Sequence, residues 1–133
     1  MPELPEIQTT VSGLQLIINK HITNIKINTK KLRYLVPKKI IKISKNRKII
    51  KVYRIAKYIL VDLSGNVTLI FHLGMSGRIR LLTINSYKTI KHDHILIYLN
   101  QKNVLVFNDP RKFGFIDYAK SSNLKNKKYL VKL

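Results

Sequence analysis

The sequence contains no cysteine and only six acidic residues. Without thiols, the chain cannot form disulfides or a zinc site built on thiolates. It also lacks any run of about eighteen apolar residues, which excludes a membrane-spanning helix. Its first residues carry acids and prolines where a signal peptide would carry basic residues and an apolar stretch. These absences predict a soluble protein with no membrane partner.

Positive charge dominates what is present, because 26 Lys and Arg residues give a formal net charge of +20. No acid lies between residues 7 and 61, although fourteen basic residues do. A drift of composition toward Lys, Ile and Asn is the alternative explanation, but drift alone would not remove acids. Charge of one sign repels itself unless a polyanion is near. Nucleic acid is the predicted partner, ahead of acidic membranes or ribosome-like RNA packing, and the expected location is cytoplasmic and nucleoid-associated.

The N-terminal segment has the apolar spacing of one amphipathic helix, over about residues 3–19. The residues that recur at intervals of three and four are Leu4, Ile7, Val11, Leu14 and Ile17. Two prolines stand at its start, where the backbone N–H groups have no partner within a helix.

The remainder is interpreted as short β segments, because apolar residues alternate with polar or basic ones between turn residues. The expected segments are 22–27, 41–43, 49–63, 67–73, 78–82, 95–99, 104–107 and 115–118. The predicted fold is mainly β with an N-terminal α-helix, arranged as an antiparallel β-sandwich. We expect one domain over residues 1–119 and a basic tail over 120–133 that begins an interdomain linker.

The first residues could carry nucleophilic chemistry. If Met1 is removed, Pro2 becomes a free secondary amine, and α-amino groups ionise near a pKa of about 8. Such an amine can attack an aldehyde-like sugar carbon and form a Schiff base. Glu3 could serve as general acid or base, and Glu6 lies one helical turn further on. The competing interpretation is that these residues only favour the start of a helix.

Two loop segments present residues suited to a nucleic-acid surface. Met75 stands between two glycines that mark a tight loop, where an exposed Met could insert between bases. The turn at 108–114 presents Arg111, a donor fork for phosphate or a base edge, and Phe113, a stacking face. Each loop alone is equally consistent with an ordinary hairpin connection.

Two further features have weaker signals. His92 and His94 are expected on one face of a strand, which would suit a metal. No third convergent ligand is evident, so a structural or hydrogen-bonding role is favoured and no metal site is predicted. Lys57 is either a solvated cation or a phosphate contact.

Taken together, these segments resemble one family, the bacterial formamidopyrimidine-DNA glycosylases. Five motifs occur in the order expected of that family, and they cover nearly the whole chain: MPELPE at the N-terminus, RIAKY at 54–58, HLGMSG at 72–77, KHDH at 91–94 and NDPRKFG at 108–114.

The resemblance implies excision of oxidised purines, 8-oxoguanine and formamidopyrimidines, from double-stranded DNA, followed by strand cleavage at the abasic site. It implies that Pro2 is the nucleophile and Schiff-base former and that Glu3 is the proton donor and acceptor. Glu6 would support the lesion surroundings, and Lys57 would bind phosphate beside it. The gap left by the flipped base and the neighbouring DNA would be contacted by Met75, His92, Arg111, Lys112 and Phe113.

The resemblance also implies a second domain, with a helix–two-turns–helix element and usually one zinc ion held by four cysteines. We expect the chain to stop before that domain, with no cofactor of its own and activity impaired. Three hypotheses follow: a minimal glycosylase or lyase, a cationic DNA-binding module without catalysis, and an inactive remnant. A separate chain supplying the second domain is a further, speculative partner.

Overall fold

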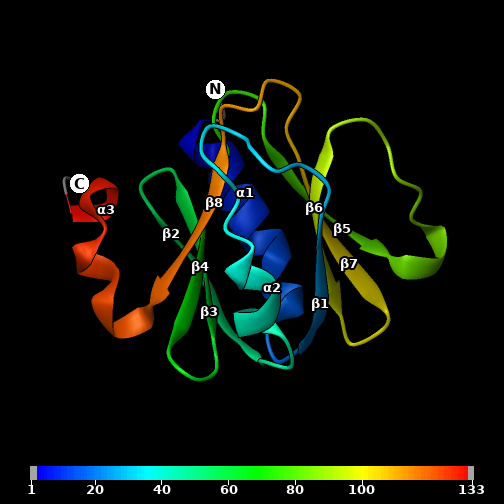
Figure 1. The fold of residues 1–133 in the computed structure, drawn as a ribbon, viewed down its shortest axis with the longest axis horizontal. Helices are drawn as coiled ribbons and strands as arrows, with labels where there is room; N and C mark the ends of the chain where they lie inside the picture. Colours follow the sequence, from blue (N-terminus) through cyan, green and yellow to red (C-terminus); the bar gives the residue numbers. More distant parts are fainter. Residues whose placement is uncertain (1–2, 132–133) are drawn as a thin grey trace.

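The computed structural model, which describes residues 3–131, shows two antiparallel sheets packed face to face (Figure 1). Each sheet has four strands, in the orders β1-β6-β7-β5 and β2-β3-β4-β8. The predicted mainly β fold with an N-terminal α-helix is confirmed. The strands are β1 (Ile22–Ile27), β2 (Ile49–Ile55), β3 (Tyr58–Leu63), β4 (Val67–His72), β5 (Arg78–Thr83), β6 (Asp93–Leu99), β7 (Asn103–Asn108) and β8 (Phe115–Lys120).

The helical elements are short. They are α1 (Leu4–Leu14), η1 (Gln15–Ile17), α2 (Lys39–Ser44), η2 (Ile84–Ser86), η3 (Ser121–Asn126) and α3 (Lys128–Val131). Helix α1 buries Ile7, Val11 and Leu14, the stripe expected from their spacing. After η1 the chain turns at Asn19, whose φ of 75° lies in the left-handed region that Asn tolerates. The N-terminal helix was therefore predicted in the right place, with its last residues in a tighter 3₁₀ turn.

Two sequence-based expectations are wrong. The segment expected as a strand at 41–43 belongs to helix α2, which buries Ile40 and Ser44, four residues apart on one helical face. The segment expected as one strand over 49–63 is two strands, β2 and β3, joined by a turn at Ala56. Ala56 has a φ of 50°, and the chain reverses direction at this turn, so that Ile55 pairs with Tyr58.

The main core lies between the two sheets and beneath α1. Phe71 of β4 and Phe107 of β7 meet edge to face there, with ring centroids 6.0 Å apart. Such pairs contribute beyond their buried area. The core thereby fixes one sheet against the other and sets the relative position of the loops at their ends.

The segment after β8 packs on the outer face of the β2-β3-β4-β8 sheet. Leu130 joins Leu60 and Ile70 in a small buried cluster. The hydroxyl of Tyr129 donates to a carboxylate oxygen of Asp117 at 2.6 Å. These contacts give residues 121–131 a defined position against the sheet, while the domain boundary after residue 119 stays a prediction.

The N-terminus of α1 lies at the same end of the sandwich as the loops after β4 and β7 (Figure 1). Within residues 3–131, no helix has the length and apolar character needed to cross a bilayer.

Candidate active site and nucleic-acid interface

The loops at 73–77 and 109–114 are joined by one buried carboxylate, Asp109. One oxygen accepts a hydrogen bond from the Ser76 hydroxyl at 2.7 Å. The other accepts from the backbone N–H of Gly114 at 2.8 Å. The Ser76 hydroxyl oxygen in turn accepts from the N–H of Arg111 at 3.0 Å. Asp109 is fully buried, so its hydrogen bonds are not exchanged with water and the two loops form one unit.

Glycine is required where the two loops touch. Gly74 has a φ of 62°, and a Cβ there would collide with the backbone of Phe113 and Gly114. A Cβ on Gly114 would lie 2.5 Å from the carbonyl oxygen of His72. The backbones therefore approach more closely than any side chain would permit.

A depression of about 400 Å³ opens beside this contact. Met75 and Phe113 are 44% and 46% exposed, so two large apolar side chains of one depression face water. The guanidinium of Arg111 lies over the Phe113 ring, 5.2 Å from its centroid. The residues lining the depression are Arg33, His72, Gly74, Met75 and Phe113.

His72 is held in one orientation at the end of β4. Its Nδ1 accepts a hydrogen bond from the Gly74 N–H at 3.0 Å, and its ring stacks on Phe115 with centroids 5.4 Å apart. A neutral ring that accepts at Nδ1 carries its proton on Nε2. Burial first, then the nearby charges of Arg33 and Lys57, lower the pKa of His72 from its ordinary 6.5. At neutral pH it is therefore an uncharged donor.

The start of α1 borders the same loop from the other side. Glu3 is the N-cap residue, its carbonyl accepting from the Ile7 N–H at 3.0 Å. Glu6, in the first turn, lines a second depression of about 230 Å³ together with Leu73 and Gly77. Pro2, the predicted nucleophile, lies outside the described residues.

Lys57 follows Ala56 in the turn between β2 and β3. The guanidinium of Arg54 braces this turn by donating to the Ala56 carbonyl at 2.9 Å. It also donates to the Gln8 side chain at 3.3 Å, which ties the turn to α1. The influence of Lys57 on the pKa of His72 places its charge near the depression.

His92 lies outside strand β6, so the expectation that both histidines of 92–94 belong to one strand is wrong, although their ring centroids lie 6.0 Å apart. His92 has a φ of 73° and precedes β6, which begins at Asp93 with a register shift before Ile95. His94 is buried, and its ring nitrogens contact the Thr29 hydroxyl at 2.6 Å and the Asp109 carbonyl at 2.7 Å. The carbonyl of His92 accepts from the Asp109 N–H, which places His92 beside the 109–114 loop.

The site contains two residues to which sequence reasoning gave no role, Arg33 and His72. Arg33 is one of fourteen cations in an acid-free stretch, and nothing local distinguishes it. Its backbone N–H donates to the Gly114 carbonyl at 3.2 Å, a contact between distant segments that only the tertiary fold reveals. His72 stood inside a recognised motif without an assigned role.

The residues of this chain do not fit a four-cysteine zinc finger of the kind the resemblance implies for the family. The chain has no cysteine. Within residues 3–131, no three His, Asp or Glu side chains are grouped to hold a metal ion.

Residues 1–116 match the family model of the formamidopyrimidine-DNA glycosylase N-terminal domain. Fold and loop cluster together thus define the N-terminal domain of a class of DNA glycosylases. The chain belongs to the formamidopyrimidine-DNA glycosylase family.

Relatives support this assignment along nearly the whole chain. The chain is 40% identical to formamidopyrimidine-DNA glycosylase of Rickettsia conorii over 131 residues, covering 98% of this chain and 47% of that protein. It is 44% identical to the Xylella fastidiosa enzyme of the same name over 115 residues, covering 86% and 42%. The chain thus spans about half the length of the curated relatives it matches.

Solved structures that are similar to this chain support the same family assignment. Lactococcus lactis Fpg in complex with DNA containing N7-benzyl-Fapy-dG superposes with a TM-score of 0.89 at 28% identity. The same protein with abasic-site DNA gives 0.88 at 27% identity. Each alignment covers 98% of this chain and 48% of the solved chain.

Proposed function

We propose that this chain carries the catalytic residues of a DNA glycosylase and abasic-site lyase that acts on oxidised purines in duplex DNA. The observation that carries the proposal is the loop unit at 73–77 and 109–114, which presents Met75, Arg111 and Phe113 at the end of the sandwich where α1 begins. The DNA lesions named for the Lactococcus lactis complexes, Fapy-dG and the abasic site, support the substrate class.

The nucleophile in this proposal is the amine of Pro2 after removal of Met1. Its lone pair attacks C1′ of the damaged nucleotide, the bond from C1′ to the base breaks, and the base leaves with a proton. Loss of the amine proton and opening of the sugar ring give an iminium. Removal of a C2′ proton then expels the 3′-phosphate, and removal of the C4′ proton expels the 5′-phosphate. Water releases the sugar fragment and restores the amine.

Two carboxylates serve the proton transfers. Glu3 adjoins Pro2 in sequence and caps α1, which suits it to deliver a proton to the opening sugar and to accept one afterwards. Glu6 lines the second depression, of about 230 Å³, beside Leu73 and Gly77. There it would face the damaged nucleotide.

Cations would hold the phosphates on either side of the lesion. The charges of Arg33 and Lys57 both act on His72. Its Nε2–H would donate to a phosphate oxygen, because its Nδ1 already accepts from the Gly74 N–H. Arg33 and His72 both line the 400 Å³ depression beside the loop unit.

Base flipping leaves a gap in the duplex that must be filled. Unstacking costs a few kcal/mol, so a protein that flips a base needs an apolar wedge and a grip on the backbone. The exposed Met75 and Phe113 would supply the wedge, with Arg111 directed at the orphaned base. His92, beside the 109–114 loop, and Lys112, within it, would contact DNA at the rim.

A second candidate function is a cationic DNA-binding module without excision. It is favoured by the net charge of +20, which supports DNA binding without requiring chemistry at Pro2. On this hypothesis the phosphate contacts form and the chemistry at Pro2 does not.

Borohydride trapping on duplex DNA with one abasic site separates the two functions. The chain with Met1 removed should give a covalent adduct, and Pro2→Gly should give much less, because a more mobile glycine does not hold its amine at the sugar. DNA binding of both proteins is measured in parallel. Binding without any adduct from the parent chain would establish the binding module; an adduct would justify repeating the assay with 8-oxoguanine.

A further inference from the structure

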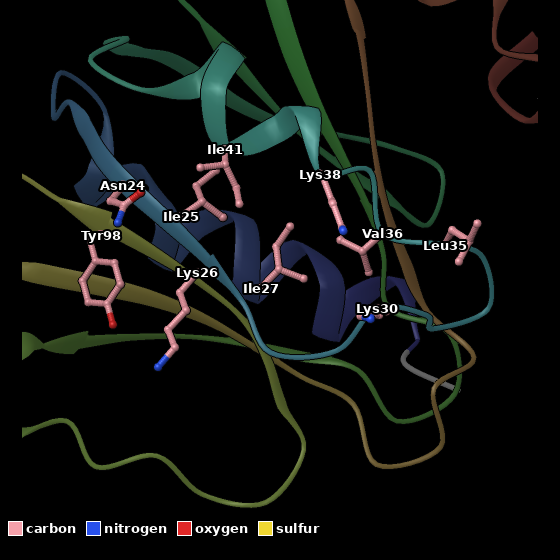
Figure 2. A pocket seen from close by; sticks show the side chains of 10 residues that line it. All are labelled: Asn24, Ile25, Lys26, Ile27, Lys30, Leu35, Val36, Lys38, Ile41 and Tyr98. Carbon is pink, nitrogen blue, oxygen red and sulfur yellow. The ribbon is translucent and has the colours of Figure 1, made fainter.

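A groove away from the loop unit runs beside strand β1. It has a volume of about 900 Å³, within the range of about 300–1,000 Å³ typical of small-molecule pockets. None of the residues proposed for DNA chemistry contributes to it. Figure 2 shows the lining residues: Asn24, Ile25, Lys26, Ile27, Lys30, Leu35, Val36, Lys38, Ile41 and Tyr98.

The groove exists because β1 is an edge strand. It pairs with β6 on one side only. Four consecutive residues, 24–27, line the groove, although successive side chains of a strand point to opposite faces. The groove therefore follows the free edge of β1 rather than one face of the sheet.

The opposite wall is formed by helix α2 and the loop that precedes it. Backbone hydrogen bonds give this loop a fixed shape, from the Val36 N–H to the Lys30 carbonyl at 2.9 Å and from the Leu32 N–H to the Tyr34 carbonyl at 3.0 Å. The groove is thus a feature of ordered backbone on both sides.

The floor of the groove is apolar. In Figure 2 the side chains of Ile27 and Ile41 are directed into the space between β1 and α2. Leu35, at one end, is 72% exposed. An apolar ligand that covers these side chains removes them from water, and this favours binding.

The rim is cationic. Lys26, Lys30 and Lys38 line the groove, and no Asp or Glu does. Neither of the two ion pairs formed within residues 3–131 involves these lysines. Figure 2 places Lys30 and Lys38 toward the Val36 end. A ligand with its negative group at that end would meet two ammonium groups.

We propose that this groove binds a free amphipathic anion, a single aliphatic chain that carries one carboxylate. The chain would lie on the isoleucines along β1, and the carboxylate would be held by Lys30 and Lys38. A polyphosphate backbone would leave the apolar floor in contact with water. An uncharged hydrocarbon would leave the lysines without a counterion. The proposal does not depend on the glycosylase function.

The test is a titration of the 133-residue chain with decanoate, followed by ¹⁵N–¹H spectra. Saturable shifts are expected at amides of residues 24–27 and 35–41. The double variant Lys30→Gln/Lys38→Gln should bind decanoate about tenfold more weakly, because neither ammonium group remains to donate a charge-assisted hydrogen bond. The matched control, Lys102→Gln/Lys125→Gln, removes the same charge from exposed sites outside the groove and should change affinity less than about twofold.

A second pair of variants tests the apolar part. Leu35→Ser should weaken decanoate binding several-fold, whereas Leu16→Ser, at a residue equally exposed but outside the groove, should not. Decyltrimethylammonium, with the same chain and the opposite charge, should produce no saturable shifts. Equal weakening by both lysine pairs, equal binding of the cationic amphiphile, or preferential binding to anionic lipid vesicles over free decanoate would overturn the proposal.

Discussion

At the scale of single residues, replacement of two glycines by alanine is predicted to change the free energy of unfolding in opposite directions. Gly74 has a φ of 62° and no room for a Cβ beside Phe113 and Gly114, whereas Gly13 in α1 has no neighbouring atom within 4 Å of that position. Gly74→Ala should lower the free energy of unfolding by about 1–3 kcal/mol. Gly13→Ala should raise it by about 0.5–1 kcal/mol, because alanine favours helix. Urea unfolding measures both, and destabilisation by both would contradict the described backbone.

Asp109 is predicted to be the residue on which the loop unit depends. Asp109→Asn places an amide where Ser76 and Gly114 both donate, so one donor loses its acceptor inside the protein. The expected loss is about 2–3 kcal/mol in urea unfolding. Asp117→Asn makes the same change at a partly exposed site, and should cost under about 1 kcal/mol. A similar cost for both variants would show that burial of Asp109 is not what matters.

The lowered pKa of His72 predicts that the free energy of unfolding depends on pH. Its pKa in the folded protein is lowered from 6.5, mainly by burial, so the unfolded chain takes up a proton at a higher pH than the folded protein. The stabilisation is complete above about pH 6.5 and is lost as the pH falls below it. His72→Gln should flatten the fall in urea midpoint between about pH 7.5 and 5.5. The exposed His21→Gln is the control, and an unchanged slope in His72→Gln would contradict the assignment.

At the scale of elements, the segment 121–131 is predicted to stabilise the sheet it covers. Tyr129 stacks on Tyr58, with ring centroids 5.1 Å apart, and donates to Asp117. Tyr129→Ser should cost about 2 kcal/mol. Tyr34→Ser, the same change at a side chain that is 56% exposed, should cost under about 1 kcal/mol. Calorimetric unfolding compares them, and no loss of stability in Tyr129→Ser would mean that these contacts of the segment add none.

Strand patterns were predictable where the alternation was long and bounded by turn residues. Strand β4 follows the turn at 64–66, and the hairpin of β6 and β7 encloses polar residues at 100–102, so both were located from sequence. Helix α2 was not, because alternation over three residues cannot separate a period of 2 from one of 3.6. The break between β2 and β3 was missed because Ala56 gives no turn signal, although its φ is positive.

The candidate site likewise contains residues that the sequence indicates and contacts that only the structure reveals. Met75, Arg111 and Phe113 lie in loops whose glycines and proline are visible in the sequence, and the structure brings all three to one end. The contact of Arg33 with the 109–114 loop joins segments about eighty residues apart, and such pairings depend on the packing of the two sheets. The groove beside β1 likewise arises from an edge strand and a helix that sequence reasoning did not place together.

At the scale of the whole molecule, few basic side chains form ion pairs within the part of the chain that the structure describes. Within residues 3–131, ion pairs form only between Arg80 and Asp93 and between Lys127 and Asp117, each at 2.9 Å. Asp109 is occupied by Ser76 and Gly114. Most of the positive charge is therefore not neutralised within the protein, and DNA affinity should fall steeply with salt whether or not the chain is an enzyme.

The slope of that fall distinguishes a localised contact from diffuse charge. Plotted as log affinity against log salt, the slope changes by about 0.9 for each phosphate that the protein neutralises. Lys57→Gln removes a cation near His72 and should reduce the slope by about one on abasic-site DNA. Lys102→Gln removes the same charge from an exposed turn of the β6–β7 hairpin and should leave the slope unchanged. If both variants lower the slope alike, the protein holds DNA by its total charge and the loop unit gives no preferred orientation. A change confined to Lys57→Gln places the phosphate backbone near His72 and the loop unit.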